Sequence, residues 1–248
     1  MFTQKRGFVF NLLLLVISLF TVFVLTACGG NGGQPASGSG TETGKTNGSD
    51  SNGGEKITLS FGHLGAPGNV PDLIANDFAE EVAKRTDGRL EIELYGNAQL
   101  GGELEMAEQV NMGTLDLALL TIGVYSNFVP ELGVMDLPFL FKDEAHARSI
   151  MDGEIGQELA NKMVEAGFKP LAFLDYGFGQ LATADQSVRT PEEMQGMQVR
   201  VLESEVNQAT LAALGADVVP IAYPELYTSL QMGVVDGAIL AIEPYDRD

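Results

Sequence analysis

Residues 196–215 read GMQVRVLESEVNQATLAALG and predict a strand that leads directly into a helix. The two valines around Arg200 face one side of such a strand, while the guanidinium faces the other side. Ser204 suits the N-cap of the helix, and Gly215 suits its end. A strand joined in this way to a helix is typical of an α/β layer.

The rest of the chain continues this alternation on both sides of residues 196–215. We expect strands at residues 57–61, 90–94, 115–120, 170–174 and 234–240, with 115–120 apolar enough to be covered on both faces. We expect helices from Pro71 to near Gly88, at 103–112, around Ile155, Leu159 and Met163, and at 224–232. No fixed-period repeat is present, so a solenoid is excluded.

The N-terminus has the pattern of a secretory lipoprotein. Lys5 and Arg6 precede an apolar run from Phe8 to Val24, and this run leads to Leu25-Thr26-Ala27-Cys28. We therefore expect residues 1–27 to be a signal peptide and Cys28 to carry lipid. The alternative is a permanent transmembrane anchor, since the run approaches the ~20 residues that cross a bilayer. Both interpretations place the remaining chain outside the cytoplasm, in the periplasm or on the outer face of the membrane.

The segment after this signal and the overall charge narrow the function further. Residues 28–55 are rich in Gly, Ser, Asn and Thr, and predict a flexible tether. Cys28 is the only cysteine, so no disulfide, thiolate metal site or cysteine nucleophile is expected. The formal net charge of −20 makes nucleic acid and anionic lipid headgroups unsuitable partners for the surface.

Residues for catalysis are scarce in this chain. It has two histidines, and it contains neither a Gly-x-Ser-x-Gly elbow nor a phosphate-binding loop. His146 lies among charged residues and is expected on a solvated face. His63 follows the first predicted strand in a glycine-rich loop, where α/β proteins place ligand contacts; a structural role is the alternative. We expect no enzyme activity, no cofactor and no metal site.

Five stretches in a fixed order resemble the DctP-type periplasmic solute-binding proteins of TRAP (tripartite ATP-independent periplasmic) transporters. They are Phe78–Val82 with Gly88–Ile92, Gln99-Leu100-Gly101, Val134–Phe141, Thr190–Val201, and Pro224–Gln231 with Gly233–Gly237. The resemblance implies a two-lobed α/β fold of the periplasmic-binding-protein type II-like class, with a ligand cleft between lobes. We expect lobe I at residues 56–177 and lobe II at 178–248. In such proteins the chain returns to lobe I, so we expect the C-terminal part to be missing here.

The resemblance also implies which residues bind the ligand. Arg200 matches the family arginine that binds a carboxylate, and its planar guanidinium suits a bidentate contact. Glu203 is expected to tune Arg200 or to meet a ligand amine or hydroxyl. Thr121 is a further pocket candidate at the end of a predicted strand.

Two departures from the family pattern bear on the ligand. Residues 177–181 lack the second arginine of many sialic-acid and dicarboxylate members, and residues 238–240 lack their Gln-Glu-Asn. The sequence therefore favours a monocarboxylate with an apolar body, walled by Phe178, Tyr223 and Leu240. The alternative for each of these three side chains is a place in the core.

We thus expect an extracytoplasmic, lipid-anchored protein that captures a small organic acid and delivers it to the integral-membrane subunits of a TRAP transporter. One alternative is a ligand-sensing lipoprotein that serves a membrane kinase. A surface-anchored hydrolase is another alternative, which the lack of a nucleophile, a base and a metal cluster disfavours.

Overall fold

The computed structural model describes residues 55–241. The predicted signal peptide, Cys28 and the tether before Glu55 lie outside the described residues. Within 55–241, none of the helices has the length and apolar character needed to cross a bilayer.

The first sheet is entirely parallel and has the strand order β2-β1-β3. Its strands are β1 (Ile57–His63), β2 (Leu90–Tyr95) and β3 (Leu117–Leu119). The register pairs Ile57 with Leu90 and Phe61 with Leu117. Parallel neighbours need a crossover, and helices supply the connections here.

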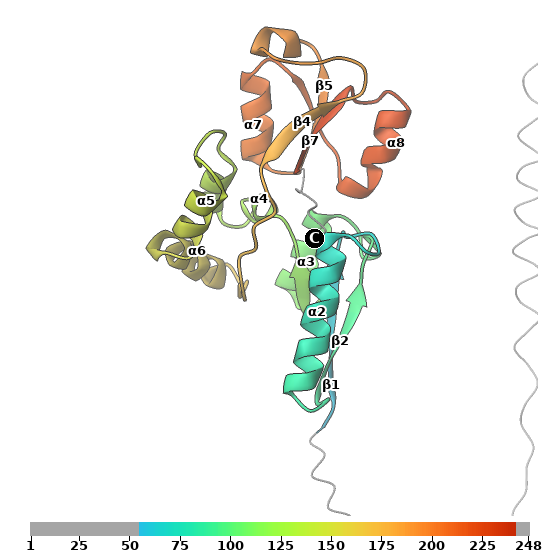
Figure 1. Ribbon diagram of the computed structural model, residues 1–248, viewed down its shortest axis with the longest axis vertical. Coiled ribbons are helices and arrows are strands. Elements are labelled where there is room, and N and C mark those ends of the chain that lie inside the picture. The colour runs from blue at the N-terminus through green and yellow to red at the C-terminus, as the bar shows by residue number, and fades with distance from the viewer. Residues whose placement is uncertain (1–54, 242–248) are drawn as a thin grey trace, which may run out of the picture. The chain divides into compact units, whose positions relative to one another are not determined.

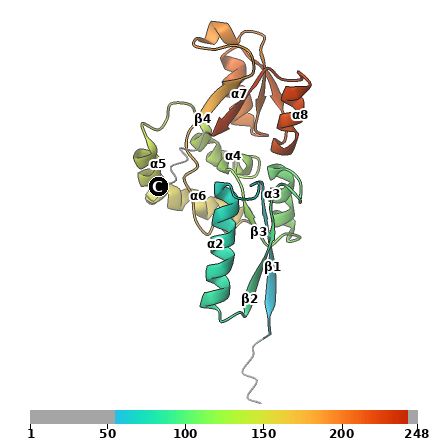
Figure 2. The ribbon, with the colours of Figure 1, turned by 45° about the vertical axis from the view of Figure 1, so that its right-hand side comes forward.

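Helix α2 (Val70–Arg85) connects β1 to β2 and runs along them, as Figures 1 and 2 show. Asn69 caps its N-terminus by accepting a 3.3 Å hydrogen bond from the Asp72 backbone N–H. Helix α3 (Glu103–Met112) ends at Gly113, which adopts a φ of 72°, the left-handed conformation that glycine adopts without strain. The short helix α4 (Ile122–Tyr125) follows β3.

A group of helical segments follows the first sheet. They are the 3₁₀ helix η1 (Pro130–Asp136), α5 (Glu144–Met151) and α6 (Glu154–Glu165). Apolar side chains from α6 and from the segments around η1 form one buried cluster, composed of Val129, Leu132, Leu159, Met163 and Phe168. The predicted helix around Ile155, Leu159 and Met163 is α6, and the Ile155 side chain on it is 50% exposed.

The second sheet is mixed and has the order β4-β7-β5-β6. Its strands are β4 (Gly179–Thr183), β5 (Gln198–Val201), β6 (Asp217–Pro220) and β7 (Gly237–Ala241). Strand β5 pairs in parallel with β6 and β7, whereas β4 pairs antiparallel to β7. The other elements are η2 (Pro191–Met194), α7 (Glu205–Ala213), η3 (Tyr223–Glu225) and α8 (Leu226–Gln231).

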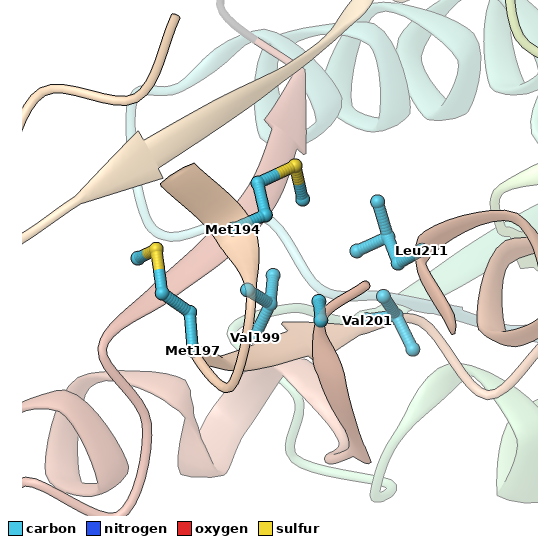
Figure 3. Packing of buried hydrophobic residues seen from close by; sticks show 6 residues of the cluster. Met194, Met197, Val199, Val201 and Leu211 are labelled. Atoms are coloured by element: carbon cyan, nitrogen blue, oxygen red, sulfur yellow. The ribbon is translucent and has the colours of Figure 1, made fainter. Parts of the chain in front are cut away.

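The valines of β5 anchor the core of this second sheet. Figure 3 shows Val199 and Val201 packed with Met194, Met197 and Leu211, and Ala216 completes the buried cluster. Both valines are 0% exposed, and complete burial of such a side chain is worth roughly 1.5 kcal/mol or more. As predicted, the valines face the core while Arg200 lies outside this cluster.

Two strand predictions were wrong. Residues 170–174 form no strand, and Leu171 and Leu174 are 64% and 51% exposed, because no described strand pairs with this segment. Strand β3 spans three half-buried residues instead of the six that were expected, so it is not covered on both faces. Strands β4 and β6 were not predicted.

Candidate functional site

Arg200 is the third residue of β5, one of the two internal strands of the second sheet. Its register partners are Val219 on β6 and Ala238 on β7. Side chains at paired positions of adjacent strands share one face of a sheet, so Arg200, Val219 and Ala238 lie on the same face.

The Arg200 side chain is only 3% exposed, yet part of its hydrogen-bonding capacity is unused. Its Nε donates a 2.7 Å hydrogen bond to the carbonyl oxygen of Ile221, and its Cζ lies 6.0 Å from the centre of the Tyr223 ring. The Nη2 atom is buried without a hydrogen-bond partner among residues 55–241. A buried charged donor that lacks an acceptor is costly, so this atom marks a place for an anionic acceptor.

Glu103 is the residue that the sequence reasoning missed. It opens helix α3 and is only 8% exposed, and its Oε1 accepts a 2.7 Å hydrogen bond from the backbone N–H of Thr121 and a further one from the Thr121 hydroxyl. Burial raises the pKa of Glu103, while Thr121 and the charge of Arg200 oppose this shift. An acidic residue at a helix start signals a helix boundary, but its burial depends on segments far away in sequence.

The electrostatic balance at Arg200 follows from these neighbours. Burial lowers the pKa of Arg200, and the charges of Glu103 and Glu203 together with Tyr223 oppose that shift. Arginine has an ordinary pKa so far above neutrality that the guanidinium stays charged. The site is therefore a buried cation flanked by two acidic residues.

The start of α3 approaches the loops of the second sheet closely. A Cβ atom at Gly102 would lie 3.0 Å from the Cβ of Ala222 and 3.9 Å from Oε2 of Glu203. Ala222 follows Ile221, whose carbonyl oxygen accepts the hydrogen bond from Arg200 Nε. Glycine at this position thus allows Glu103 to approach the Arg200 site.

The loop after β5 is also held by residues 127–136. Asn127 Nδ2 donates a 2.8 Å hydrogen bond to the Glu203 carbonyl, and Asp136 Oδ2 accepts hydrogen bonds from Ser204 Oγ at 3.1 Å and Asn207 Nδ2 at 3.0 Å. Ser204 is the predicted N-cap of α7. These contacts fix the backbone that carries Glu203.

A cavity of about 450 Å³ lies beside Tyr223. Its lining includes Leu64, Asn97, Tyr223, Leu226, Tyr227 and Leu230. Arg200 is not part of the lining, but Tyr223 contacts both Arg200 and the cavity. A second cavity, of about 460 Å³ beside α5, contains none of the predicted site residues.

The remaining predicted residues are placed as follows. Thr121 is the N-cap of α4 and is bonded to Glu103. Phe178 is 41% exposed just before β4, and Leu240 is half-buried on β7 opposite Gln180. Nothing in the described residues tests Phe178 and Leu240 as ligand walls, so this role stays a prediction.

His63 differs from the expectation of a loop residue, because it is the last residue of β1 and is 0% exposed. Cβ atoms at Gly65 and Gly96 would lie 3.0 Å and 2.7 Å from ring atoms of His63, so glycine backbone encloses the imidazole. Burial lowers the pKa of His63, and the charge of Asp72, whose Oδ1 lies 3.8 Å from Nε2, opposes the shift. Such an enclosed ring favours the structural alternative. In residues 55–241, no group of His, Cys, Asp and Glu is arranged to hold a metal ion.

Comparison with known proteins places this chain in a family. The model of DctP, the bacterial extracellular solute-binding protein family 7, matches residues 61–245. A solute-binding protein of Verminephrobacter eiseniae is 42% identical over 160 residues, which make up 64% of this chain and 48% of that protein. The C4-dicarboxylate-binding periplasmic protein DctP of Rhodobacter capsulatus is 33% identical over 184 residues, 74% of this chain and 55% of that protein.

A solved structure gives the same result for the fold. The TRAP periplasmic solute binding protein of Polaromonas sp. JS666, bound to D-erythronate, is 37% identical and matches with a TM-score of 0.72, over 74% of this chain and 61% of that chain. This likeness confirms the predicted periplasmic-binding-protein fold. The chain spans about half the length of the curated relatives it matches. The chain belongs to the bacterial extracellular solute-binding protein family 7, the DctP family.

Proposed function

We propose that this protein captures a small organic acid outside the cytoplasm, through Arg200, and delivers it to the integral-membrane subunits of a TRAP transporter. The observation that carries the proposal is the buried Nη2 atom of Arg200, which lacks an acceptor among the described residues. A ligand carboxylate would supply that acceptor through a charge-assisted hydrogen bond. The relatives that bind C4-dicarboxylate and D-erythronate support a carboxylate as the ligand class.

The neighbours of Arg200 favour an acid with one carboxylate at this site. Glu103 and Glu203 both lie close enough to act on the pKa of Arg200. A second ligand carboxylate in the same place would face these acidic residues without a cation of its own. Like charges within a partly buried site disfavour each other's ionisation, so a dianion is expected to bind less well.

Binding calorimetry on the full chain tests the role of Arg200. Native mass spectrometry of protein purified without added ligand identifies the bound acid, which then serves as the titrant. Arg200→Ala should weaken binding by roughly 2 to 5 kcal/mol, which is about 30-fold to several thousand-fold, because one partner of a desolvated charge pair is removed. Arg200→Lys should also bind weakly, since an ammonium cannot form two parallel hydrogen bonds to a carboxylate.

The matched control is Arg85→Ala, which removes an arginine side chain that is 77% exposed on α2. It should leave the affinity unchanged. Near-wild-type affinity in Arg200→Ala would place the carboxylate elsewhere and contradict the proposal.

The membrane attachment is a separate part of the proposal. Lipid on Cys28 would hold the folded part at the membrane through the tether of residues 28–55. Cys28→Ser should then leave an unlipidated precursor, and mass spectrometry of the mature N-terminus measures this. A wild-type chain that is cut elsewhere, or that carries an unmodified Cys28, contradicts the lipoprotein interpretation.

A further inference from the structure

The cavity beside Tyr223 is lined mainly by aliphatic and aromatic residues and is of a suitable size for a ligand. Its volume of about 450 Å³ falls in the range of roughly 300–1,000 Å³ that is typical of small-molecule sites. Leucine, alanine, proline and tyrosine side chains form most of the lining, and Asn97 contributes the single amide. None of the described residues that line the cavity is charged.

Backbone donors at the cavity are already used within the protein. The backbone N–H of Asn97 donates a 2.8 Å hydrogen bond to the Gly65 carbonyl, and that of Ala98 donates a 3.3 Å bond to the His63 carbonyl. Pro224, which also lines the cavity, has no N–H group. These three backbone positions therefore offer no N–H group to a ligand hydroxyl.

Tyr223 links this cavity to the carboxylate site. Its ring lies 6.0 Å from Cζ of Arg200 and also forms part of the cavity lining. This position of Tyr223 suits an acid whose carboxylate pairs with Arg200 and whose body extends toward the cavity.

We propose that the ligand is a monocarboxylate with an apolar body, aliphatic or aromatic, and that this body occupies the cavity lined by Leu64, Tyr223, Tyr227 and Leu230. This inference rests on the proposed function, because it takes the Arg200 site as the place of the carboxylate. The apolar body gains free energy by leaving water, whereas each buried hydroxyl needs a hydrogen-bond partner, and the lining offers side-chain partners only at Asn97 and at the hydroxyls of Tyr223 and Tyr227. The site would therefore discriminate against polyhydroxylated acids.

Two six-carbon monocarboxylates, hexanoate and gluconate, separate these alternatives. They share the charge and the number of carbon atoms, but gluconate carries five hydroxyl groups. Calorimetry on the full chain should show that hexanoate binds at least about tenfold more tightly, since a single methylene in an apolar pocket is worth about tenfold or more. Equal affinities, tighter binding of gluconate, or no binding of hexanoate would overturn the inference.

Variants of the lining sharpen this test. Leu64→Asn places an amide in the cavity and should reduce the ratio of the hexanoate affinity to the gluconate affinity by about tenfold. Tyr227→Ser removes a ring that is 75% exposed, so it changes the lining with little risk to folding. This variant should weaken the binding of hexanoate several-fold. Met112→Asn is the control, because it introduces the same amide at a position that is 69% exposed at the end of α3.

Arg200→Ala distinguishes failure of this inference from failure of the proposed function. If gluconate binds more tightly than hexanoate and Arg200→Ala abolishes its binding, the apolar body is wrong and the carboxylate site stands. If Arg200→Ala binds hexanoate as tightly as the wild type does, the proposed function itself is contradicted.

Discussion

Arg200 and His63 are alike in burial and differ in their neighbours. Arg200 is 3% exposed on β5, and His63 is 0% exposed at the end of β1. Both carry buried side-chain nitrogens that lack hydrogen-bond partners among residues 55–241. By the measure of unsatisfied polar atoms alone, both would be candidate ligand sites.

Their surroundings separate the two residues. Glu103 and Glu203 stabilise the charge of Arg200, which also donates to Ile221, so a charged donor remains inside the protein. His63 is enclosed by Phe61 and by the glycines at 65 and 96, and burial lowers its pKa. A buried nitrogen thus indicates an anion site when the group stays charged, and a packing role when the group is neutral.

Gly96→Ala should destabilise the protein through His63. The new Cβ would lie 2.7 Å from Cε1 and 2.9 Å from Nε2 of the His63 ring, which is closer than side chains pack. Overpacking of this kind costs roughly 1 to 3 kcal/mol in the free energy of unfolding, which chemical denaturation measures.

The double variant Gly96→Ala with His63→Ala supplies the control for this clash. If the ring is the cause, the double variant should be more stable than the sum of the two single losses indicates. Additive losses would show that the alanine acts on the backbone instead, and would remove the packing role from His63.

The free energy of unfolding should depend on pH partly through His63. Its pKa in the folded protein lies below its ordinary value of 6.5, so the unfolded chain binds the proton more readily. The stability that this histidine contributes is present above pH 6.5 and is lost as the pH falls from there through the folded pKa. We therefore expect the contribution of this group to the free energy of unfolding to decrease between pH 7 and pH 5.

His63→Leu should remove that part of the pH dependence. The difference between the wild-type and variant plots of unfolding free energy against pH isolates the contribution of His63 from those of Glu103 and Asp136. Burial raises the pKa values of these two acids and so favours the folded state at lower pH. His146→Leu, which removes the only other histidine, is the control. Identical curves for the wild type and His63→Leu would show that His63 can be protonated in the folded protein, as a ligand-site histidine could be.

Local signals in the sequence predicted much of this fold. Gly113 and Ser204 act as caps where they were expected, because capping depends on a few adjacent residues. Strand pairing depends on distant segments instead. Residues 170–174 are apolar but have no partner strand, whereas the short β6 at 217–220, which ends in a proline, gains its place from pairing with β5.

Prediction of the candidate site was likewise limited by contacts between segments that are distant in the sequence. The alternation around Arg200 indicated that its side chain faces away from the core, and the family resemblance supplied its role. Glu103 could not be found in this way. Its hydrogen bonds to Thr121 join positions 18 residues apart, and its interaction with Arg200 joins helix α3 to strand β5. His63 was misplaced because the strand before it is two residues longer than its alternating pattern.

The smallest expected effect concerns Glu103, which distinguishes the Arg200 site from that of His63. Glu103→Gln keeps an oxygen that accepts from Thr121, but it removes a negative charge that acts on Arg200. The guanidinium should then attract an anionic ligand more strongly, and we expect the affinity to rise by about threefold, or about 0.6 kcal/mol. Glu108→Gln removes the same charge from an exposed position on α3 and should leave the affinity unchanged. Titration calorimetry with the identified acid measures both variants. A large loss of affinity in Glu103→Gln would mean that this carboxylate binds the ligand directly, and that the acidic neighbours do more than balance the charge of Arg200.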